Sequence, residues 1–188
     1  YTYVLHGDGD IQEPVAQGSI ALAGHWGLNK LIAFYDSNDA QISGKVSRAD
    51  STDYAKMYES HGWHVQEIDG HDHDKIRSAI RMAQMEIEKP SVIIGKTIMA
   101  KGCDSVESDH NTHGAPLSHE EIYNTKKKLE LDPEEFFALP TDILDDFRSS
   151  FDYARQEVDS WKRRLEERQK DGQFKTLWNS SKNLTIPE

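Results

Sequence analysis

An aspartate between two glycines directly follows an apolar segment near the start of the chain. Gly7, Asp8 and Gly9 come after residues 3–5, a Tyr-Val-Leu segment that is typical of a strand. A strand, a glycine turn and a following helix bring backbone N–H groups toward a phosphate. The carboxylate of Asp8 adds an oxygen ligand of the kind that a hard cation such as Mg²⁺ requires. The sequence therefore predicts a diphosphate site bridged by a metal.

A second oxygen donor, Asn38, follows the next strand-like apolar segment, residues 31–35. It lies about 30 residues beyond Asp8, which is the length of one strand-helix-strand crossover. Because such a crossover returns the chain to the same sheet, we expect both side chains at the carboxyl ends of neighbouring parallel strands. Ligands bind at that edge in open α/β sheets. Asp8 and Asn38 therefore indicate one shared site.

Strands and helices are predicted to alternate over the first two thirds of the chain. Apolar segments alternate with helix-forming ones, and Asp53 and Ser118 stand at helix-capping positions. This alternation predicts an α/β fold, a parallel sheet with flanking helices. The expected strands are 2–6, 30–36, 63–68 and 91–99, and the expected helices are 12–25, 54–61, 74–88 and 118–128.

The C-terminal part differs from the rest in composition. Residues 100–117 lack periodicity, and connections of that length are more often functional or mobile than plain links. A charged helix is expected from Thr141 to Asp171, and its mixed charge is typical of a solvated face. We therefore predict an α/β domain at 1–130, followed at 131–188 by a helical extension that leads into a linker.

The composition argues against two classes of partner. With a formal net charge of -11 at pH 7, the chain has no basic surface that would attract nucleic acid or anionic lipid. It has no apolar stretch of the length of a membrane span, and no signal peptide is recognised before the first strand. The single cysteine, Cys103, excludes an internal disulfide and is expected to be inert. These features predict a soluble, cytoplasmic protein.

Further motifs follow the glycine turn in a fixed order. They are Leu22-Ala23-Gly24, Ile32-Ala33-Phe34-Tyr35-Asp36, Gly62-Trp63-His64-Val65, Asp69-Gly70-His71-Asp72, Lys96-Thr97-Ile98 and His113-Gly114-Ala115-Pro116-Leu117. Gly7-Asp8-Gly9 and Asn38 look like the thiamine diphosphate motif, and together with these segments the chain resembles transketolase in order and spacing. The resemblance covers nearly the whole chain and is weak beyond about Leu131.

The resemblance implies thiamine diphosphate and Mg²⁺ as cofactors, with Ca²⁺ or Mn²⁺ as alternatives to Mg²⁺. It assigns the metal to Asp8, Asn38 and the backbone carbonyl of Ala40. Diphosphate oxygens and water would complete the octahedron that Mg²⁺ prefers. Gly7 and Gly9 would then lie beside the diphosphate, where the N–H of Gly9 can approach it.

Three further positions match family residues at the cofactor. Ile42 matches a position that packs against the thiazolium ring, although the residue alone would be assigned to the core. Glu13 matches a glutamate that hydrogen-bonds toward the catalytic glutamate of the partner subunit; alternatively, one turn into the helix 12–25, it only stabilises the helix dipole. His113 matches a histidine beside the diphosphate and the donor hydroxyls, where an imidazole can donate to an anionic oxygen. The catalytic assignments are thus His113 and Glu13.

The resemblance also implies a reaction and partners. The expected reaction transfers a two-carbon ketol unit from a ketose phosphate to an aldose phosphate, in the pentose phosphate pathway. Family active sites form in a homodimer, where the pyrimidine-binding domain of the other subunit supplies the catalytic glutamate. That domain and the family's upstream histidines have no counterpart in this chain, and Tyr1 is not a methionine. The chain is therefore expected to be part of a longer polypeptide and to be inactive alone.

Other functions stay open at this point. Gly-Asp-Gly and a later asparagine also occur in 1-deoxyxylulose 5-phosphate synthase and in the alpha subunit of 2-oxo acid dehydrogenases, and a non-catalytic scaffold could retain the fold. The chain also departs from the family, because Gly18 stands where a second glutamate is usual and Ala100-Lys101-Gly102 replaces Gly-Phe-Gly. The pair His71 and His73 fits a helix N-terminus better than a metal site.

Overall fold

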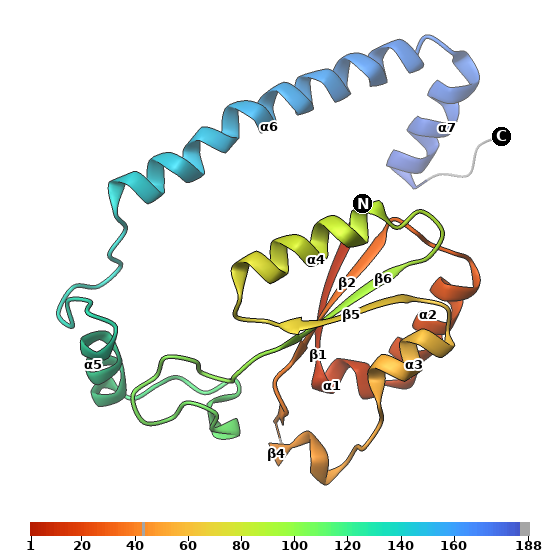
Figure 1. The fold of residues 1–188 in the computed structure, drawn as a ribbon. Coiled ribbons are helices and arrows are strands. Elements are labelled where there is room, and N and C mark those ends of the chain that lie inside the picture. Colours follow the sequence, from red (N-terminus) through yellow and green to blue (C-terminus); the bar gives the residue numbers. More distant parts are fainter. Residues whose placement is uncertain (43, 185–188) are drawn as a thin grey trace. The chain divides into compact units, whose positions relative to one another are not determined.

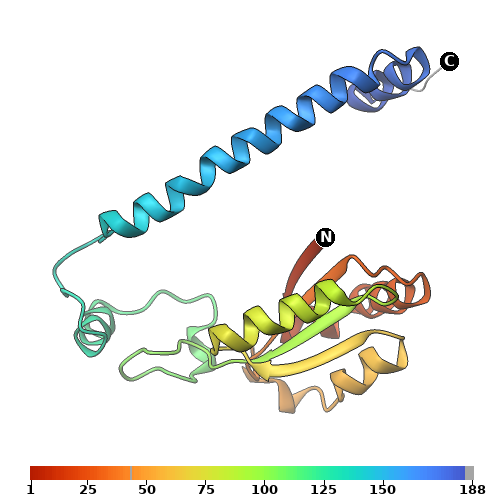
Figure 2. The same cartoon turned by 45° about the horizontal axis from the view of Figure 1, so that its top comes forward.

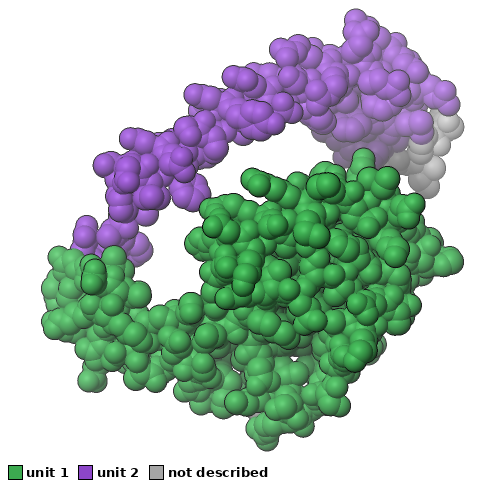
Figure 3. Space-filling view, viewed as in Figure 1, with its two compact units in different colours: residues 1–134 green, residues 135–188 purple. Residues whose placement is uncertain are grey.

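The computed structural model describes residues 1–42 and 44–184, and the chain divides into two compact units. Unit 1 comprises residues 1–134 and unit 2 comprises residues 135–188 (Figure 3). The division falls close to residue 130, where the composition changes. Each unit has its own internal packing and is described separately.

Unit 1 is built on a sheet of four parallel strands in the order β1-β2-β6-β5 (Figure 1). The strands are β1 Thr2–Gly7, β2 Leu31–Ser37, β5 His64–Asp69 and β6 Ser91–Lys96. β6 is buried over all but its last residue, as a central parallel strand covered on both faces should be. β1 pairs directly with β2, so their carboxyl ends meet at one edge. The predicted parallel α/β fold is confirmed.

Helices cover both faces of this sheet (Figure 1, Figure 2). They are α1 Asp8–Gln12, α2 Pro14–His25, α3 Tyr54–Ser60 and α4 His73–Met85. Ala83 of α4 shares one core with Ile32 of β2, whereas Ile20 of α2 and Tyr58 of α3 share the other core with Ala33. Because successive side chains of a strand point to opposite faces, β2 contributes to both cores.

The helix predicted for residues 12–25 is interrupted at Glu13. α1 ends at Gln12 and α2 begins at Pro14, and Glu13 between them has an extended backbone, with φ -70° and ψ 131°. Pro14 lacks an N–H, and its ring disfavours the helical conformation of the residue before it. The predicted helix is confirmed with a start two residues later and with Pro14 in its first turn as expected, but the placement of Glu13 one turn inside it was wrong, because Glu13 is its N-cap.

β6 is shorter than predicted. It ends at Lys96 rather than at residue 99, because its neighbours end at the same level: Lys96 is in register with Ser37 of β2 and with Asp69 of β5. Beyond that level the sheet offers no further ladder partner.

The small residues of α2 permit a close backbone contact, as their composition indicates. A Cβ added at Gly24 would lie 1.8 Å from the carbonyl oxygen of His61, just after α3. In the same region the indole N–H of Trp63 donates to the carbonyl of Ile20 at 2.9 Å. These contacts fix α2 against the chain that leads into β5.

A short two-stranded sheet follows β2. β3 Ala40–Gln41 pairs antiparallel with β4 Gly44–Lys45, and the 3-10 helix η1 Val46–Arg48 comes next. This hairpin lies just beyond Asn38 and so frames the edge at which β1 and β2 end.

A long connection, residues 97–118, links β6 to α5 His119–Lys128 and contains the 3-10 helix η2 His110–Thr112. The hydroxyl of Ser118 accepts the N–H of Glu121 at 3.1 Å, so the predicted cap of α5 is confirmed.

Over residues 135–184, the described part of unit 2, the chain forms two helices, α6 Thr141–Arg168 and α7 Gly172–Asn183. The predicted charged helix is confirmed, although it ends at Arg168 rather than at Asp171, and α7 follows it. The carboxylate of Asp171 caps α7, and the rings of Phe174 and Trp178 stack with centroids 6.1 Å apart. None of the helices in the described part of the chain is long and apolar enough to cross a membrane.

Candidate functional site

Asp8 and Asn38 meet at the carboxyl ends of β1 and β2. Asp8 is the first residue of α1, directly after β1, and Asn38 directly follows β2. The backbone N–H of Asn38 donates to Oδ2 of Asp8 at 3.1 Å. The structure thus brings together the two residues whose spacing indicates a common site.

Asp8 is a buried carboxylate, only 4% exposed. Its Oδ1 accepts the hydroxyl of Tyr35 at 2.5 Å, and Oδ2 accepts the Asn38 N–H. Burial and the bond to Asp8 raise the pKa of Tyr35, so its hydroxyl stays protonated and acts as donor. Within the described residues Asp8 has no ion pair with lysine or arginine. Buried charges are usually paired or bind metals, so this carboxylate fits a cation ligand.

Asn38 and Ala40 form a tight turn next to that carboxylate. Oδ1 of Asn38 accepts the N–H of Ala40 at 3.0 Å, and its Nδ2 donates to Asp36 at 3.2 Å. Asp39 between them has a left-handed φ of 58°, a conformation that aspartate tolerates better than most residues. An amide oxygen has two lone pairs, so Oδ1 keeps capacity for a second partner such as a metal.

One cavity of about 830 Å³ joins all of the predicted site residues. Its lining includes the eight positions assigned from the sequence, Gly7, Asp8, Gly9, Glu13, Asn38, Ala40, Ile42 and His113. The remaining lining residues come from α1, the end of β2, β3, residue 49 just after η1, and the connection between β6 and α5. The geometry places these residues around one space, while their individual roles stay predictions.

The cavity lining is strongly acidic. Four carboxylates line it, those of Asp8, Asp10, Glu13 and Asp36, and none of its described lining residues is lysine or arginine. A bare diphosphate would be repelled by such a surface at close range. An anionic ligand can bind here only with a cation that neutralises part of the charge, which is the arrangement that a metal-bridged diphosphate provides.

Gly9 fits close approach by a ligand. It lines the cavity, and a Cβ added there would meet no protein atom within 4 Å. Its φ is also not in the left-handed range, so neither crowding by the protein nor backbone conformation requires glycine. Open space beside a backbone N–H is what the approach of a diphosphate needs.

Ile42 is not part of the core. Its side chain is 82% exposed although it lines the cavity. The assignment of this isoleucine to the core from residue type alone was wrong, because Ile42 lies in the turn between β3 and β4, outside the four-stranded sheet. An exposed isoleucine at a cavity wall offers an apolar surface for a ring.

His113 reaches the cavity from the long connection before α5. It is exposed and follows η2, and Thr112 and Gly114 line the cavity on either side of it. Glu13 also faces the cavity and is exposed. The structure therefore brings both residues with predicted catalytic roles to the same space.

The residues of the site that were not predicted from the sequence include Tyr35 and Asp10. Tyr35 was treated only as a strand residue, although its position in an alternating strand, opposite His6 in register, could have placed it beside Asp8. Asp10 was also missed; its carboxylate accepts the Gly7 N–H at 2.8 Å, which a glycine before a short acidic helix could have signalled.

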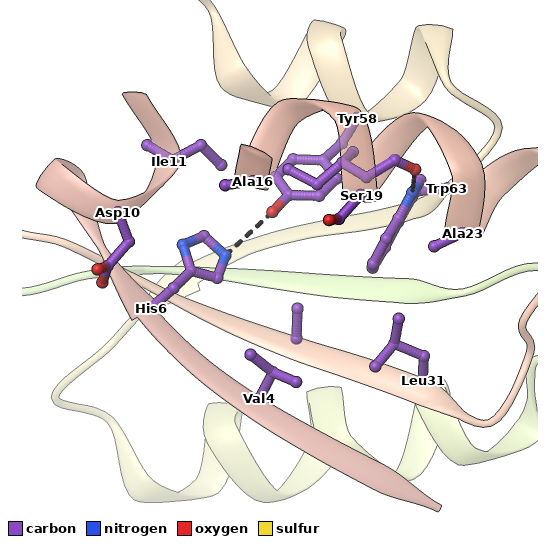
Figure 4. Close-up of a pocket in the computed structure, with 12 residues that line it drawn as sticks. Val4, His6, Asp10, Ile11, Ala16, Ser19, Ala23, Leu31, Tyr58 and Trp63 are labelled. Carbon is purple, nitrogen blue, oxygen red and sulfur yellow. Dashed lines mark hydrogen bonds between the residues drawn. The ribbon is translucent and has the colours of Figure 1, made fainter. Parts of the chain in front are cut away.

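His6 is half-buried, and Figure 4 shows its ring directed toward Tyr58. It stacks on Tyr35 with centroids 5.0 Å apart, and its Nε2 lies 3.0 Å from the hydroxyl of Tyr58. Its Nδ1 is buried with no partner in the described part of the chain. Burial lowers the pKa of His6, which keeps the ring neutral.

The histidines near α4 do not form a metal centre. Nε2 of His71 accepts the N–H of Ile98 at 2.8 Å, and His73 is the first residue of α4. The described residues contain no group of three or more His, Cys, Asp or Glu side chains arranged for a metal ion. The candidate set at Asp8 contains only one carboxylate and is of another kind, an oxygen set completed by an amide and a backbone carbonyl.

Known proteins are similar to this chain in sequence and in fold. Residues 1–180 match the family described as transketolase, thiamine diphosphate binding domain. The chain is 40% identical over 144 residues to transketolase 1 of Pasteurella multocida. This alignment covers 76% of this chain and 21% of that protein. It is 36% identical over 167 residues to the transketolase of Staphylococcus epidermidis, which covers 88% of this chain and 25% of the relative.

Solved structures give the same result. The transketolase from Leishmania mexicana matches with a TM-score of 0.89 and 31% identity, over 100% of this chain and 28% of that one. The Campylobacter jejuni transketolase matches with a TM-score of 0.82 and 37% identity, over 87% of this chain and 26% of that one. The chain thus spans about a quarter or less of the length of the Pasteurella and Staphylococcus relatives. With its fold, its cavity and these matches, the chain belongs to the transketolase family, as a part of the thiamine diphosphate-binding domain.

Proposed function

We propose that this chain is the diphosphate- and metal-binding part of a transketolase that depends on thiamine diphosphate and Mg²⁺. The enzyme transfers a two-carbon ketol unit from a ketose phosphate to an aldose phosphate, a reaction of the pentose phosphate pathway. The acidic cavity that joins Asp8 and Asn38 is the observation that carries the proposal. An anionic cofactor fits it only together with a cation.

Asp8, Asn38 and the backbone carbonyl of Ala40 hold the metal in this proposal, and Mg²⁺ is the ion that an all-oxygen set of this kind favours. Ca²⁺ or Mn²⁺ can substitute, because both accept oxygen ligands. Gly7 and Gly9 leave room for the diphosphate, and Ile42 packs its exposed side chain against the cofactor ring.

When bound, thiamine diphosphate supplies the carbon nucleophile of the reaction. His113 lies where it can donate a hydrogen bond to a substrate oxygen that gains negative charge. In this proposal Glu13, an exposed lining residue between α1 and α2, hydrogen-bonds to a carboxyl group from a partner subunit. That subunit is a second copy of the same protein, whose pyrimidine-binding domain provides the proton acceptor, and the assembled enzyme works in the cytoplasm.

The test is ketol transfer from xylulose 5-phosphate to ribose 5-phosphate by the full-length polypeptide that contains this chain. We expect sedoheptulose 7-phosphate to form only with thiamine diphosphate and Mg²⁺ present. The variant Asp8→Ala should lose this activity, whereas Asp74→Ala, at an exposed carboxylate on α4, should retain it. Cofactor-dependent activity that survives Asp8→Ala would contradict the metal assignment.

Residues 1–188 purified alone should show no ketol transfer, because in this proposal the proton acceptor comes from the pyrimidine-binding domain of the partner subunit. A full-length protein that binds the cofactor in calorimetry but yields no sedoheptulose 7-phosphate would instead support a different thiamine diphosphate reaction. Absence of cofactor binding would support a non-catalytic scaffold.

A further inference from the structure

The connection that carries His113 passes α5 before it reaches the cavity. Met99 lines the cavity at the start of the connection, and Thr112, His113 and Gly114 line it near the end. Between these points, residues 103–105 make hydrogen bonds with α5. The chain thus leaves the site, touches α5, returns to the site and then enters α5 at Ser118.

Glu121 is the centre of that contact with α5. It is only 7% exposed, and its two carboxylate oxygens accept the N–H of Ser105 at 3.0 Å and the hydroxyl of Ser105 at 2.5 Å. These bonds from Ser105 lower the pKa of Glu121, so the carboxylate is ionised at neutral pH and accepts both protons. A buried carboxylate with two donors on one residue holds that residue in a defined place.

Two more α5 residues strengthen the contact. The hydroxyl of Thr125 donates to Glu121 at 3.2 Å and accepts the N–H of Asp104 at 3.0 Å. Nζ of Lys128 donates to the carbonyl of Cys103 at 2.6 Å. We call Glu121, Thr125 and Lys128 the loop clamp. They occupy one side of α5 at a spacing of three to four residues, so one rigid helix fixes three consecutive residues of the connection.

The connection is anchored to α5 at two points. Residues 103–105, in its first half, are hydrogen-bonded to the loop clamp, and its last residues lead directly into α5 after Leu117. Only residues 106–117 lie between these points, and η2 within them contacts β4 at the rim of the cavity. The N–H of Ser108 also donates to the carbonyl of Met99 at 2.8 Å, so residues 109–117 are held at one end by this bond and at the other end by α5. If the clamp no longer tied α5 to residues 103–105, the α5 end of this segment would be freer, and the position of η2 would be less restricted.

We infer that Glu121 is a positioning residue for His113, because its bonds to Ser105 restrict the connection so that His113 stays at the cavity wall. Glu121 does not line the cavity, so it would not contact a ligand bound there. Its role in catalysis rests on the proposed function of His113, but its role in placing the loop does not.

The first test follows amide hydrogen exchange in the full-length protein. The amides of Thr112 and His113 donate to the carbonyls of Asp109 and His110, both at 3.1 Å, so they report on η2. We expect Glu121→Ala to speed exchange at these two amides by about tenfold or more. Glu120→Ala, at the exposed neighbouring position, should leave them unchanged.

Two further variants guard against a general loss of α5. Glu121→Gln can still accept the Ser105 N–H and can donate to its hydroxyl, so it should restore exchange to near the wild-type rate. Ser105→Ala removes the partner hydroxyl without changing α5 and should speed exchange at Thr112 and His113 in the same direction as Glu121→Ala. Unchanged exchange at these amides in both Glu121→Ala and Ser105→Ala, or no rescue by glutamine, would overturn the inference.

The second test measures ketol transfer in a double-mutant cycle. If Glu121 acts through His113, then Glu121→Ala should lower kcat by about tenfold in the wild-type background, since small misplacements of reacting groups are costly. In the His113→Ala background it should lower kcat by less than about twofold. Equal losses in both backgrounds would show that Glu121 does not act through His113. If the wild type has no ketol transfer, the proposed function fails, while the exchange experiment still decides the placement of the loop.

Discussion

The hydroxyl of Tyr35 donates a 2.5 Å hydrogen bond to the carboxylate of Asp8. The two residues belong to neighbouring strand ends, because Tyr35 is in register with His6 of β1 and Asp8 directly follows β1. Tyr35 is 3% exposed, so the phenol is held in the core and its donor is aimed at one carboxylate oxygen. A hydrogen bond of this kind orients a metal-binding side chain, here the carboxylate of Asp8, before a metal binds.

Removal of that hydroxyl should therefore weaken metal binding. We expect Tyr35→Phe to reduce Mg²⁺ affinity about tenfold, since loss of an outer partner of a ligand costs about 10- to 100-fold. Calorimetric titration of the full-length protein with Mg²⁺ in the presence of thiamine diphosphate measures this. Tyr153→Phe, at an exposed tyrosine of α6, serves as control. Equal Mg²⁺ affinity in the two variants would show that Asp8 needs no support from Tyr35.

Two glycines of α2 should respond in opposite ways to the same substitution. Gly24→Ala forces a Cβ against the His61 carbonyl and should lower the free energy of unfolding by about 3 kcal/mol. Gly18→Ala meets no atom within 4 Å and should raise it by about 1 kcal/mol, because alanine is the better helix former. Urea unfolding of both variants measures the difference. A similar loss at both positions would contradict the close contact at Gly24.

Stability should depend on pH through His6. Burial lowers the pKa of His6, and the weaker effects of Asp10 and Asp8 oppose this. Just below pH 6.5 the unfolded chain therefore binds more protons at His6 than the folded chain does. The contribution of neutral His6 to the free energy of unfolding is present above that pH and is lost as the pH falls toward the pKa of His6 in the folded protein.

The variant His6→Leu should remove this part of the pH dependence. Unfolding midpoints measured between pH 5 and 8 should fall less steeply on acidification in the variant than in the wild type. His119→Gln, at an exposed position, controls for the loss of one histidine. Parallel pH profiles for wild type and His6→Leu would exclude His6 as the source.

Ile42 should matter for the cofactor and not for folding. Because the side chain is 82% exposed, Ile42→Ala should change the free energy of unfolding by less than about 0.5 kcal/mol. Affinity for thiamine diphosphate should fall by about tenfold, as apolar area against the ring is lost. Ile93→Ala, at a residue with 0% exposure, should instead cost about 2–5 kcal/mol of stability. Unchanged cofactor affinity in Ile42→Ala would refute the ring contact.

The sequence predicts the parts of the fold that depend on local rules. The crossover from Asp8 to Asn38 and the cap at Ser118 follow from spacing and from side-chain chemistry, and both agree with the structure. The break at Glu13 also follows from a local rule, the restriction on the residue before proline, which the prediction of the helix 12–25 did not include.

Other features depend on tertiary contacts that no local pattern contains. β6 ends where its neighbours end, which is set by the register of three strands rather than by the strand-forming residue types at 97–99. Ile42 is assigned to the core by residue type, and only the hairpin β3–β4 shows that it faces the cavity. The bonds of Glu121 to Ser105 join α5 to a segment without periodicity, so nothing in the sequence signals them.

The four carboxylates around the cavity influence whether a diphosphate approaches it more readily alone or bound to a metal ion. A diphosphate that reaches this surface without a cation meets net repulsion, which weakens its encounter with the protein. A diphosphate already bound to Mg²⁺ carries less negative charge and approaches more readily. Under the proposed function, the acidic lining therefore favours the cofactor as its metal complex over the free diphosphate, and added salt, by screening the repulsion, should weaken this preference.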